Sequence, residues 1–513
     1  MIRGLGLPRL RALLGVLLLT GLLAGCSLVP APQVTSTPVT NGAPTETRAF
    51  YGQRLVWRDC GNGMQCSTAT APLDWSKPSG TRISLALTRR PASGQRIGTL
   101  FMNPGGPGVA AVSFLKESAT SIFDRPLLDA YDIVAWDPRG VGASEPAVDC
   151  YGTAKLDDFL FGDPDLPEGS PALHREVLSS SRDFGRACQQ ETGPLLAHVD
   201  TISVARDLDM LRGAVGERKL DYFGFSYGTS IGAEYADLFP QRVGRMALDG
   251  AVDPSKTSFE ENLANTKAFG AALKSYLADC VRSSGCPFAG LSVDQAVDRI
   301  ARLLVRLRES PVRAADGRSV NSAYLRTAID AALYDEGSWK VLSQAFTQIL
   351  RGETQLTLAL ADSYVDRGRS GYTDNLFEAI FAVNCLDKPV ETDPAVLKQQ
   401  GAALEAADPL RAADNTEDLG DPVCGNWPVP PVQQPHRIKA TGSPAILVLG
   451  TTGDPATPYQ WAQSVAKQLP KGVLLTFRGE GHTAYRNGSR CINDPVDAYF
   501  VHGTVPGKDI TCG

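Results

Sequence analysis

A serine between two glycines is the residue of this sequence whose surroundings most clearly favour chemistry. Ser226 is the central residue of Gly224-Phe225-Ser226-Tyr227-Gly228, which fits the pattern GxSxG. The apolar run LDYF precedes this pentapeptide, and TSIGAEYADLF, which has helical spacing, follows it. A strand, a sharp turn and a helix form a nucleophile elbow, in which close packing leaves no room for a Cβ at the glycines and the serine hydroxyl is exposed above a sheet. The segment therefore predicts Ser226 as a nucleophile.

A serine hydroxyl is a weak nucleophile at neutral pH, so it needs a general base and an acid that orients the base. The sequence has five histidines. His482 follows the strand-like run VLLTF and comes last in the order Ser, acid, His that accompanies this type of turn, whereas His174 and His198 precede Ser226. We predict His482 as the base.

Two aspartates follow strand-like runs and are candidates for the acid. Asp454 comes after AILVLG and Asp249 after RMAL, and sites in open α/β sheets form at such strand ends. We favour Asp454, because Thr457 and Pro458 already fit the N-cap and N1 positions of the next helix, which leaves no capping role for Asp454. Thr457 is also expected to line the site.

The oxyanion of an acyl-transfer reaction needs preorganised N–H donors. One is expected from Tyr227, the residue after the nucleophile. The other is expected from Gly106 in the turn Asn103-Pro104-Gly105-Gly106-Pro107-Gly108, although an ordinary Gly/Pro turn is the alternative. The missing GK[ST] excludes a phosphate-binding loop.

Seven short apolar runs alternate with helical patterns, which is typical of strands buried on both faces of a parallel sheet. The sequence therefore predicts an α/β-hydrolase fold with a mainly parallel sheet. Between about 256 and 435 the strand pattern stops, and stripes such as Val293, Val297, Ile300, Leu304 and Leu307 indicate helices. We expect a helical lid at 256–440, inserted between core segments at 48–255 and 441–513. The seven runs are ISLAL (83–87), GTLFMN (98–103), YDIVAWD (131–137), LDYFGF (220–225), RMALDG (245–250), AILVLG (445–450) and VLLTF (473–477).

The N-terminus has the pattern of an export signal. Residues 1–25 combine three arginines with an apolar run too short to span a bilayer permanently, and they end at Leu-Ala-Gly before Cys26, which looks like a lipobox. An ordinary signal peptide with an unmodified Cys26 is the alternative. Residues 26–47, rich in Pro, Thr and Ser, are expected to form a solvated tether. We expect export to the cell envelope, with a lipid at Cys26 holding the protein to the outer face of the cytoplasmic membrane or the protein shed from it.

Composition narrows the class of partner. Lys and Arg total 50 against 56 Asp and Glu, so there is no basic excess for phosphate contacts, and nucleic acid is excluded as a partner. Without Cys26, an even number of the 11 cysteines remains, which favours disulfides in an exported chain. There is no CxxC and there are only five histidines, so a structural zinc site is not expected. No other metal and no organic cofactor is expected either. The pairs expected from neighbours in sequence are Cys60–Cys66, Cys150–Cys188, Cys280–Cys286, Cys385–Cys424 and Cys491–Cys512.

A series of motifs, from NPGGPG, DPRGVGAS and YFGFSYGTSIGAEYADLFP to AVNCLD, DPATPY and GEGHTAY, covers nearly everything after the tether. With them the chain resembles the tripeptidyl aminopeptidase family of exported actinobacterial α/β-hydrolase serine peptidases, and most closely its envelope-anchored carboxylesterase/peptidases. The resemblance implies Ser226, Asp454 and His482 as the triad and a largely helical lid. It also implies cleavage of short peptides from free N termini, and in some members ester hydrolysis.

An aminopeptidase needs an acidic group that pairs with the substrate's ammonium at a fixed distance from the nucleophile. Asp387, in the insertion near an expected disulfide, is the candidate, and an ordinary loop or capping role is its alternative. The favoured function is a serine aminopeptidase that releases tripeptides from peptide or protein N termini. A carboxylesterase or lipase with the same triad is the alternative, and a non-catalytic peptide-binding lipoprotein is a third hypothesis.

Overall fold

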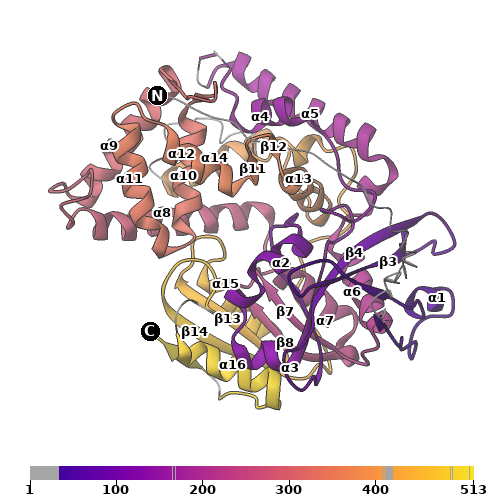
Figure 1. The fold of residues 1–513 in the computed structure, drawn as a ribbon. Coiled ribbons are helices and arrows are strands. Elements are labelled where there is room, and N and C mark those ends of the chain that lie inside the picture. The colour runs from indigo at the N-terminus through magenta and orange to yellow at the C-terminus, as the bar shows by residue number, and fades with distance from the viewer. Residues whose placement is uncertain are drawn as a thin grey trace, which may run out of the picture.

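One mixed sheet organises the chain. The computed structural model describes residues 34–513 except 165, 168, 408, 409, 411–419, 486, 488 and 508. Within this part an 11-stranded sheet has the order β1-β2-β3-β4-β6-β5-β7-β8-β13-β14-β15 (Figure 1). Strands β1 to β4 pair antiparallel, as do β4 and β6, and all pairs from β6 to β15 are parallel. The strands are β1 (Val34–Thr35), β2 (Val56–Asp59), β3 (Gln65–Pro72), β4 (Arg82–Arg90), β5 (Gly98–Asn103), β6 (Tyr131–Trp136), β7 (Leu220–Phe225), β8 (Val243–Asp249), β13 (Ile446–Gly453), β14 (Gly472–Glu480) and β15 (Ile510–Cys512).

The parallel strands are buried because helices cover both faces of the sheet. Every residue of β5 and β6 is buried, as expected for strands without a solvated face. The prediction of an α/β fold with a mainly parallel sheet is confirmed, and each of the seven apolar runs matches a strand, with at most one residue beyond its end. The helices packed around the sheet are α1 (Arg48–Tyr51), α2 (Ala111–Ile122), α3 (Arg125–Ala130), α6 (Thr201–Val215), α7 (Tyr227–Leu238), α15 (Tyr459–Gln468) and α16 (Arg490–His502).

A helical lobe lies over one side of this core (Figure 1). Most of it is inserted between β8 and β13, and it has its own hydrophobic cluster. Its short strand pairs are β9 (Val312–Arg313) with β10 (Ser319–Val320) and β11 (Arg367–Gly368) with β12 (Gly371–Tyr372). The helices of the insertion are α8 (Ser258–Cys280), α9 (Val293–Glu309), α10 (Ser322–Leu333), α11 (Trp339–Ile349), α12 (Gln355–Tyr364), α13 (Leu376–Asp387) and α14 (Pro394–Ala407).

The helical lobe also includes a segment that we had expected to belong to the core. Helices α4 (Thr153–Phe161) and α5 (Pro171–Thr192) follow β6 and lie beside the insertion in Figure 1. Phe161 stacks on Tyr324 of α10 with ring centroids 4.0 Å apart and belongs to the lobe's hydrophobic cluster. The expected division at residue 256 is therefore wrong for α4. An amphipathic helix reveals its apolar face in the sequence but not the partner against which that face packs.

Within residues 34–47, which we had expected to belong to a solvated tether, several residues contact the core. Val34 and Thr35 form β1 at the edge of the sheet, the Val39 amide donates to the Gly213 carbonyl, and Ala43 is buried. An extended, apolar-poor segment can still pair its backbone with a sheet edge, a contact that composition does not reveal. The predicted signal peptide and Cys26 lie outside the described residues. Within those residues, no helix combines the length and apolarity needed to cross a bilayer.

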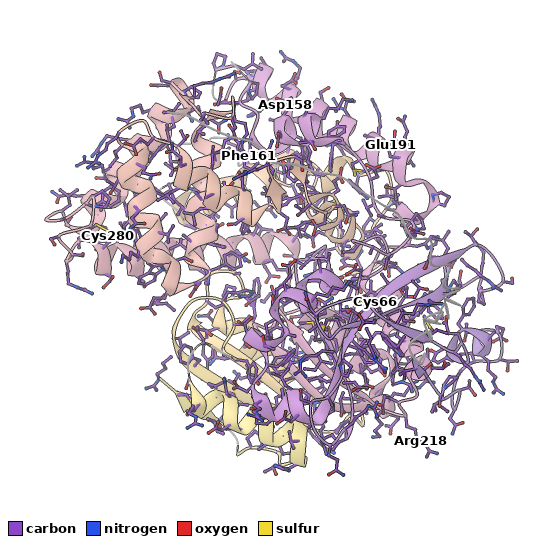
Figure 2. All side chains as sticks on the ribbon, viewed as in Figure 1. Cys66, Asp158, Phe161, Glu191, Arg218 and Cys280 are labelled. Atoms are coloured by element: carbon purple, nitrogen blue, oxygen red, sulfur yellow. A yellow bond between two sulfur atoms is a disulfide. The ribbon has the colours of Figure 1, made fainter. Side chains whose placement is uncertain are left out.

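Ten cysteines form five disulfides, which are distributed over both lobes. The labelled Cys66 lies in the sheet lobe of Figure 2 and the labelled Cys280 in the helical lobe. Cys385–Cys424 fixes the end of α13 to the segment that returns toward β13. The pairs are Cys60–Cys66, Cys150–Cys188, Cys280–Cys286, Cys385–Cys424 and Cys491–Cys512.

Candidate active site

Ser226 occupies a strained turn between β7 and α7. Its backbone has φ 53° and ψ -125°, a conformation that L-residues other than glycine rarely adopt and that tertiary packing must enforce. A Cβ at Gly224 would lie 2.4 Å from the Gly228 carbonyl oxygen, and one at Gly228 would lie 2.6 Å from that of Asn103. Both glycines are therefore required by the close approach of strand and helix, which holds the serine at the carboxyl edge of the sheet.

Asp454, at the end of β13, is bonded to His482, which follows β14. His482 Nδ1 lies 2.9 Å from both carboxylate oxygens, so its Nδ1–H donates to Asp454. The carboxylate also accepts from the amides of Ala456, Thr457 and Thr483, and from the Thr457 hydroxyl at 2.9 Å. The Asp454 side chain is fully buried. These donors fix the orientation of the carboxylate, which faces the imidazole of His482.

Thr457 serves the site rather than the helix that follows it. Helix α15 begins at Tyr459, its N-cap residue is Pro458, and no side chain caps it. The Thr457 hydroxyl instead binds Asp454 and lies 3.3 Å from His482 Nδ1. The expectation that Thr457 is the helix N-cap is therefore wrong, while its expected place beside Asp454 is where the structure puts it.

His482 Nε2 is the ring nitrogen left to accept a proton, because Nδ1 is bonded to Asp454. It is buried and makes no hydrogen bond to any described residue, so it is not bonded to Ser226 Oγ. The two residues are nevertheless linked through β8, because the Ser226 amide donates to the Asp249 carbonyl at 2.9 Å and a Cβ at Gly250 would lie 3.1 Å from His482 Cε1. Catalytic hydrogen bonds often tighten only when substrate binds.

The helical lobe contacts the imidazole through Tyr334. The Tyr334 carbonyl accepts the His482 amide at 2.8 Å, and the two rings meet edge to face with centroids 5.2 Å apart. Tyr334 follows α10, in a part of the chain where we had predicted only a lid. The sequence offers no signal for this contact, because it depends on how the lobe packs on the loop after β14.

Tyr227 and Gly106, the two residues expected to donate to an oxyanion, line one cavity with Ser226. Tyr227 is the first residue of α7, so its amide has no acceptor within the helix. Gly106 has φ 108° and lines the same cavity as Ser226 and Tyr227. The preceding Gly105 lies directly against the nucleophile, since a Cβ there would be 2.7 Å from Ser226 Cβ. The loop that contains Gly106 therefore lies directly beside the nucleophile, and its role as an oxyanion hole stays a prediction.

Asp249, the other aspartate at a strand end, holds the histidine loop. Its two carboxylate oxygens accept the amides of Ala484 and Tyr485, each at 2.8 Å, and its carbonyl accepts that of Ser226. Burial raises the pKa of Asp249 to about 7, although these amides oppose the shift. Asp454, not Asp249, is hydrogen-bonded to the imidazole of His482.

Asp387 is turned toward the core. Its carboxylate accepts the Thr201 amide at 2.8 Å and the Thr201 hydroxyl at 2.5 Å, and that hydroxyl accepts from the Tyr227 phenol at 2.6 Å. Burial raises the pKa of Asp387 to about 7, so the side chain holds a proton for much of the time at neutral pH. Both oxygens are engaged by Thr201. The expectation that Asp387 binds a substrate ammonium is therefore not supported, because its charge and its hydrogen bonds are directed elsewhere.

A cavity of about 360 Å³ lies at the nucleophile, between the carboxyl edge of the sheet and the helical lobe. The core contributes Ser226, Gly106 and Thr457, and the lobe contributes Glu261 and Lys388 among other polar groups. Its volume is at the lower end of the range for small-ligand pockets. Among the described residues, no group of His, Cys, Asp or Glu side chains is arranged to hold a metal ion.

Proteins from Mycobacterium and Streptomyces align along most or nearly all of this chain. It is 35% identical to the serine protease Hip1 of Mycobacterium tuberculosis over 99% of this chain and 100% of that protein. It is 36% identical to carboxylesterase B of the same species over 98% and 99% of the two chains, and 31% identical to the tripeptidyl aminopeptidase of Streptomyces lividans over 89% and 86%. The chain belongs to the tripeptidyl aminopeptidase family of α/β hydrolases. The predicted resemblance is thereby confirmed, and this protein is a serine hydrolase.

Two further comparisons concern parts of this hydrolase and its fold. A family model described as TAP-like protein matches residues 409–512, the segment that contains Asp454 and His482. Among solved structures, a proline iminopeptidase from Mycobacterium smegmatis has a TM-score of 0.36 at 14% identity and covers 85% of this chain and 98% of its own. A hydrolase from Pseudomonas aeruginosa PA01 also has a TM-score of 0.36, at 13% identity, and covers 87% of this chain and 100% of its own.

Proposed function

We propose that the protein is an aminopeptidase that releases short peptides, tripeptides above all, from free N termini. The observation that carries the proposal is a small cavity at Ser226, lined by both the core and the helical lobe, beside the bonded pair Asp454 and His482. A covered cavity accepts the end of a chain more readily than its middle. The relatives named serine protease and tripeptidyl aminopeptidase support the peptidase assignment.

The geometry supports an acyl-enzyme mechanism. Ser226 Oγ attacks the scissile carbonyl while His482 Nε2 takes its proton, and Asp454 stabilises the resulting imidazolium. The amides of Tyr227 and Gly106 bind the tetrahedral oxyanion. His482 then returns the proton to the leaving amine, and the C–N bond breaks. Water, deprotonated by His482, attacks the Ser226 ester and releases the N-terminal peptide.

An esterase remains the second candidate, because carboxylesterase B is as similar to this chain as the serine protease is. Both activities use the same triad, and they differ in whether the site requires a free amine on the substrate. A peptidase that binds the N terminus should lose turnover when that amine is acetylated, whereas an esterase should be indifferent.

The deciding experiment measures hydrolysis by the mature protein of a tripeptide anilide with a free or an acetylated N terminus, beside a short-chain phenyl ester. We expect cleavage of the free-amine anilide and a loss of several orders of magnitude in the Ser226→Ala variant, as for other triad knockouts. Ester turnover without any anilide cleavage would move the protein to the esterase class. Undiminished activity of Ser226→Ala would refute the triad.

We further propose export and attachment to the membrane through a lipid at Cys26. The basic and apolar leader before Cys26 and the even number of remaining cysteines support this location. Labelling of cells with a fatty-acid analogue should mark the wild type and not Cys26→Ala, which should appear in the medium. Equal labelling of the two would refute the lipid anchor.

A further inference from the structure

Glu261 is the carboxylate of the helical lobe that combines access to the cavity with an ammonium partner. It lies in the first turn of α8, its side chain is 23% exposed, and it lines the cavity that contains Ser226. Ser258, Asn262 and Asn265 line the same cavity, a spacing that places one face of α8 toward the nucleophile. The side chain of Asn265 fixes this face to the core, because its amide donates to the Ala456 carbonyl at 2.6 Å.

Glu261 already binds one ammonium group, that of Lys388. Its Oε1 forms an ion pair with the ammonium of Lys388, which directly follows α13. A carboxylate has two oxygens and can accept from more than one ammonium donor. Burial raises the pKa of Glu261 and the Lys388 ammonium opposes that shift, so a second cation placed here would further stabilise the charged carboxylate.

Three carboxylic side chains line the cavity, those of Glu261, Asp387 and Asp421, and they differ in their partners. Asp387 is engaged by Thr201, and Asp421 accepts the Cys424 amide at 2.9 Å. Glu261 is thus the carboxylate of the three whose described partner is an ammonium rather than backbone or hydroxyl groups of the cavity wall.

We propose that Glu261 binds the α-ammonium of the substrate's N terminus, so that its separation from Ser226 determines how many residues are released. This proposal rests on the proposed aminopeptidase function. Lys388 pairs with Oε1 of the carboxylate, and the substrate's ammonium binds beside it. The ligand class is therefore a peptide with a free N terminus, and a blocked peptide lacks the charge that the site recognises.

The test compares Glu261→Gln with the wild type on the free and acetylated anilides and on the phenyl ester. We expect kcat/KM for the free-amine anilide to fall about 10- to 100-fold, the range for losing a hydrogen bond to a charged group, chiefly through KM. Turnover of the ester should stay within about twofold of the wild type, since the ester has no ammonium and the same catalytic residues act on it. Ester turnover also reports that the variant is folded.

Glu260→Gln is the matched control. Glu260 is the neighbouring residue on α8, it is exposed, and it lines a different cavity from that of Ser226. It accepts the Thr257 amide in a capping box, a role that glutamine can also fill. The substitution makes the same change of charge one residue away, so we expect the preference for a free amine to persist.

Lys388→Met separates ligand binding from a purely structural ion pair. The proposal predicts that this variant keeps its preference for the free amine, because the carboxylate remains. If Lys388→Met loses the preference as Glu261→Gln does, or if Glu261→Gln loses ester and anilide turnover equally, the pair is structural and the proposal is wrong. If the wild type cleaves the free anilide and Glu261→Gln keeps the same preference, the role of Glu261 is refuted but the aminopeptidase function is not. A wild type that cleaves no anilide refutes the aminopeptidase function itself.

Discussion

At the residue scale, the charge state of His482 controls the reaction. Burial by itself lowers the pKa of His482, but the Asp454 carboxylate, 2.9 Å away, raises it more, so the pKa lies above its ordinary value of 6.5. Since folding raises this pKa, the stability that His482 contributes is fully present below about pH 6.5 and is lost as the pH rises through the folded-state pKa. Catalysis has the opposite dependence, because only the neutral imidazole accepts the proton of Ser226.

This charge state predicts the pH profile. We expect kcat/KM to rise with pH through an apparent pKa above 6.5, the ordinary value for histidine. In Asp454→Asn the midpoint should fall, because the carboxylate no longer stabilises the imidazolium, and the rate should also fall. The measurement is kcat/KM for the anilide from pH 5 to 9 in both proteins. A wild-type midpoint below 6.5, or one that Asp454→Asn leaves unmoved, would contradict the assigned pair.

At the scale of the elements, β8 joins the nucleophile to the histidine. Its last residue, Asp249, binds the Ser226 amide through its carbonyl and two amides of the loop after His482 through its carboxylate. Asp249→Asn keeps the shape but turns an N–H toward one of these amides. We expect a loss of about 1 to 3 kcal/mol in unfolding free energy, the cost of an unsatisfied buried group. Because the displaced loop carries His482, kcat should fall more than KM rises.

Thermal unfolding and steady-state kinetics on the same preparations test this. Asp221→Asn is the control, because Asp221 likewise accepts a backbone amide, that of Arg245, but from β7 at the other end of the strands. It should lower stability without a selective loss of kcat. If both variants lose kcat equally relative to their stability, Asp249 has no special part in positioning the base.

The same scale explains which parts of the protein the sequence predicts. Ser226, Asp454 and His482 follow apolar runs, and in a parallel sheet the ends of such strands meet at one edge, so local patterns place them together. The contact of Tyr334 with His482 and the placement of α4 in the helical lobe were missed because they depend on packing between segments far apart in the chain. The partner of Asp387 was equally hidden in the sequence, since Thr201 begins a core helix 186 residues away.

At the scale of the whole molecule, the helical lobe must be held at a fixed height above the nucleophile. Cys385 in α13 is bonded to Cys424, and Cys424 lines the cavity with Lys388 and Asp387. This disulfide therefore connects two walls of the cavity. By contrast, Cys491–Cys512 joins α16 to β15 at the far edge of the sheet, and neither cysteine lines that cavity.

Removal of each disulfide should therefore have different consequences. Cys385→Ala with Cys424→Ala, and Cys491→Ala with Cys512→Ala, should each lower the unfolding free energy by about 3 to 4 kcal/mol, as loop closure predicts for segments of these lengths. Only the first pair should raise KM for the free-amine anilide, by several-fold, because two walls of the cavity that contains Ser226 are no longer linked. Denaturant unfolding and anilide kinetics on both variants provide the comparison. Equal KM values in the two would show that packing of the lobe alone, without the covalent link, sets the geometry of the cavity.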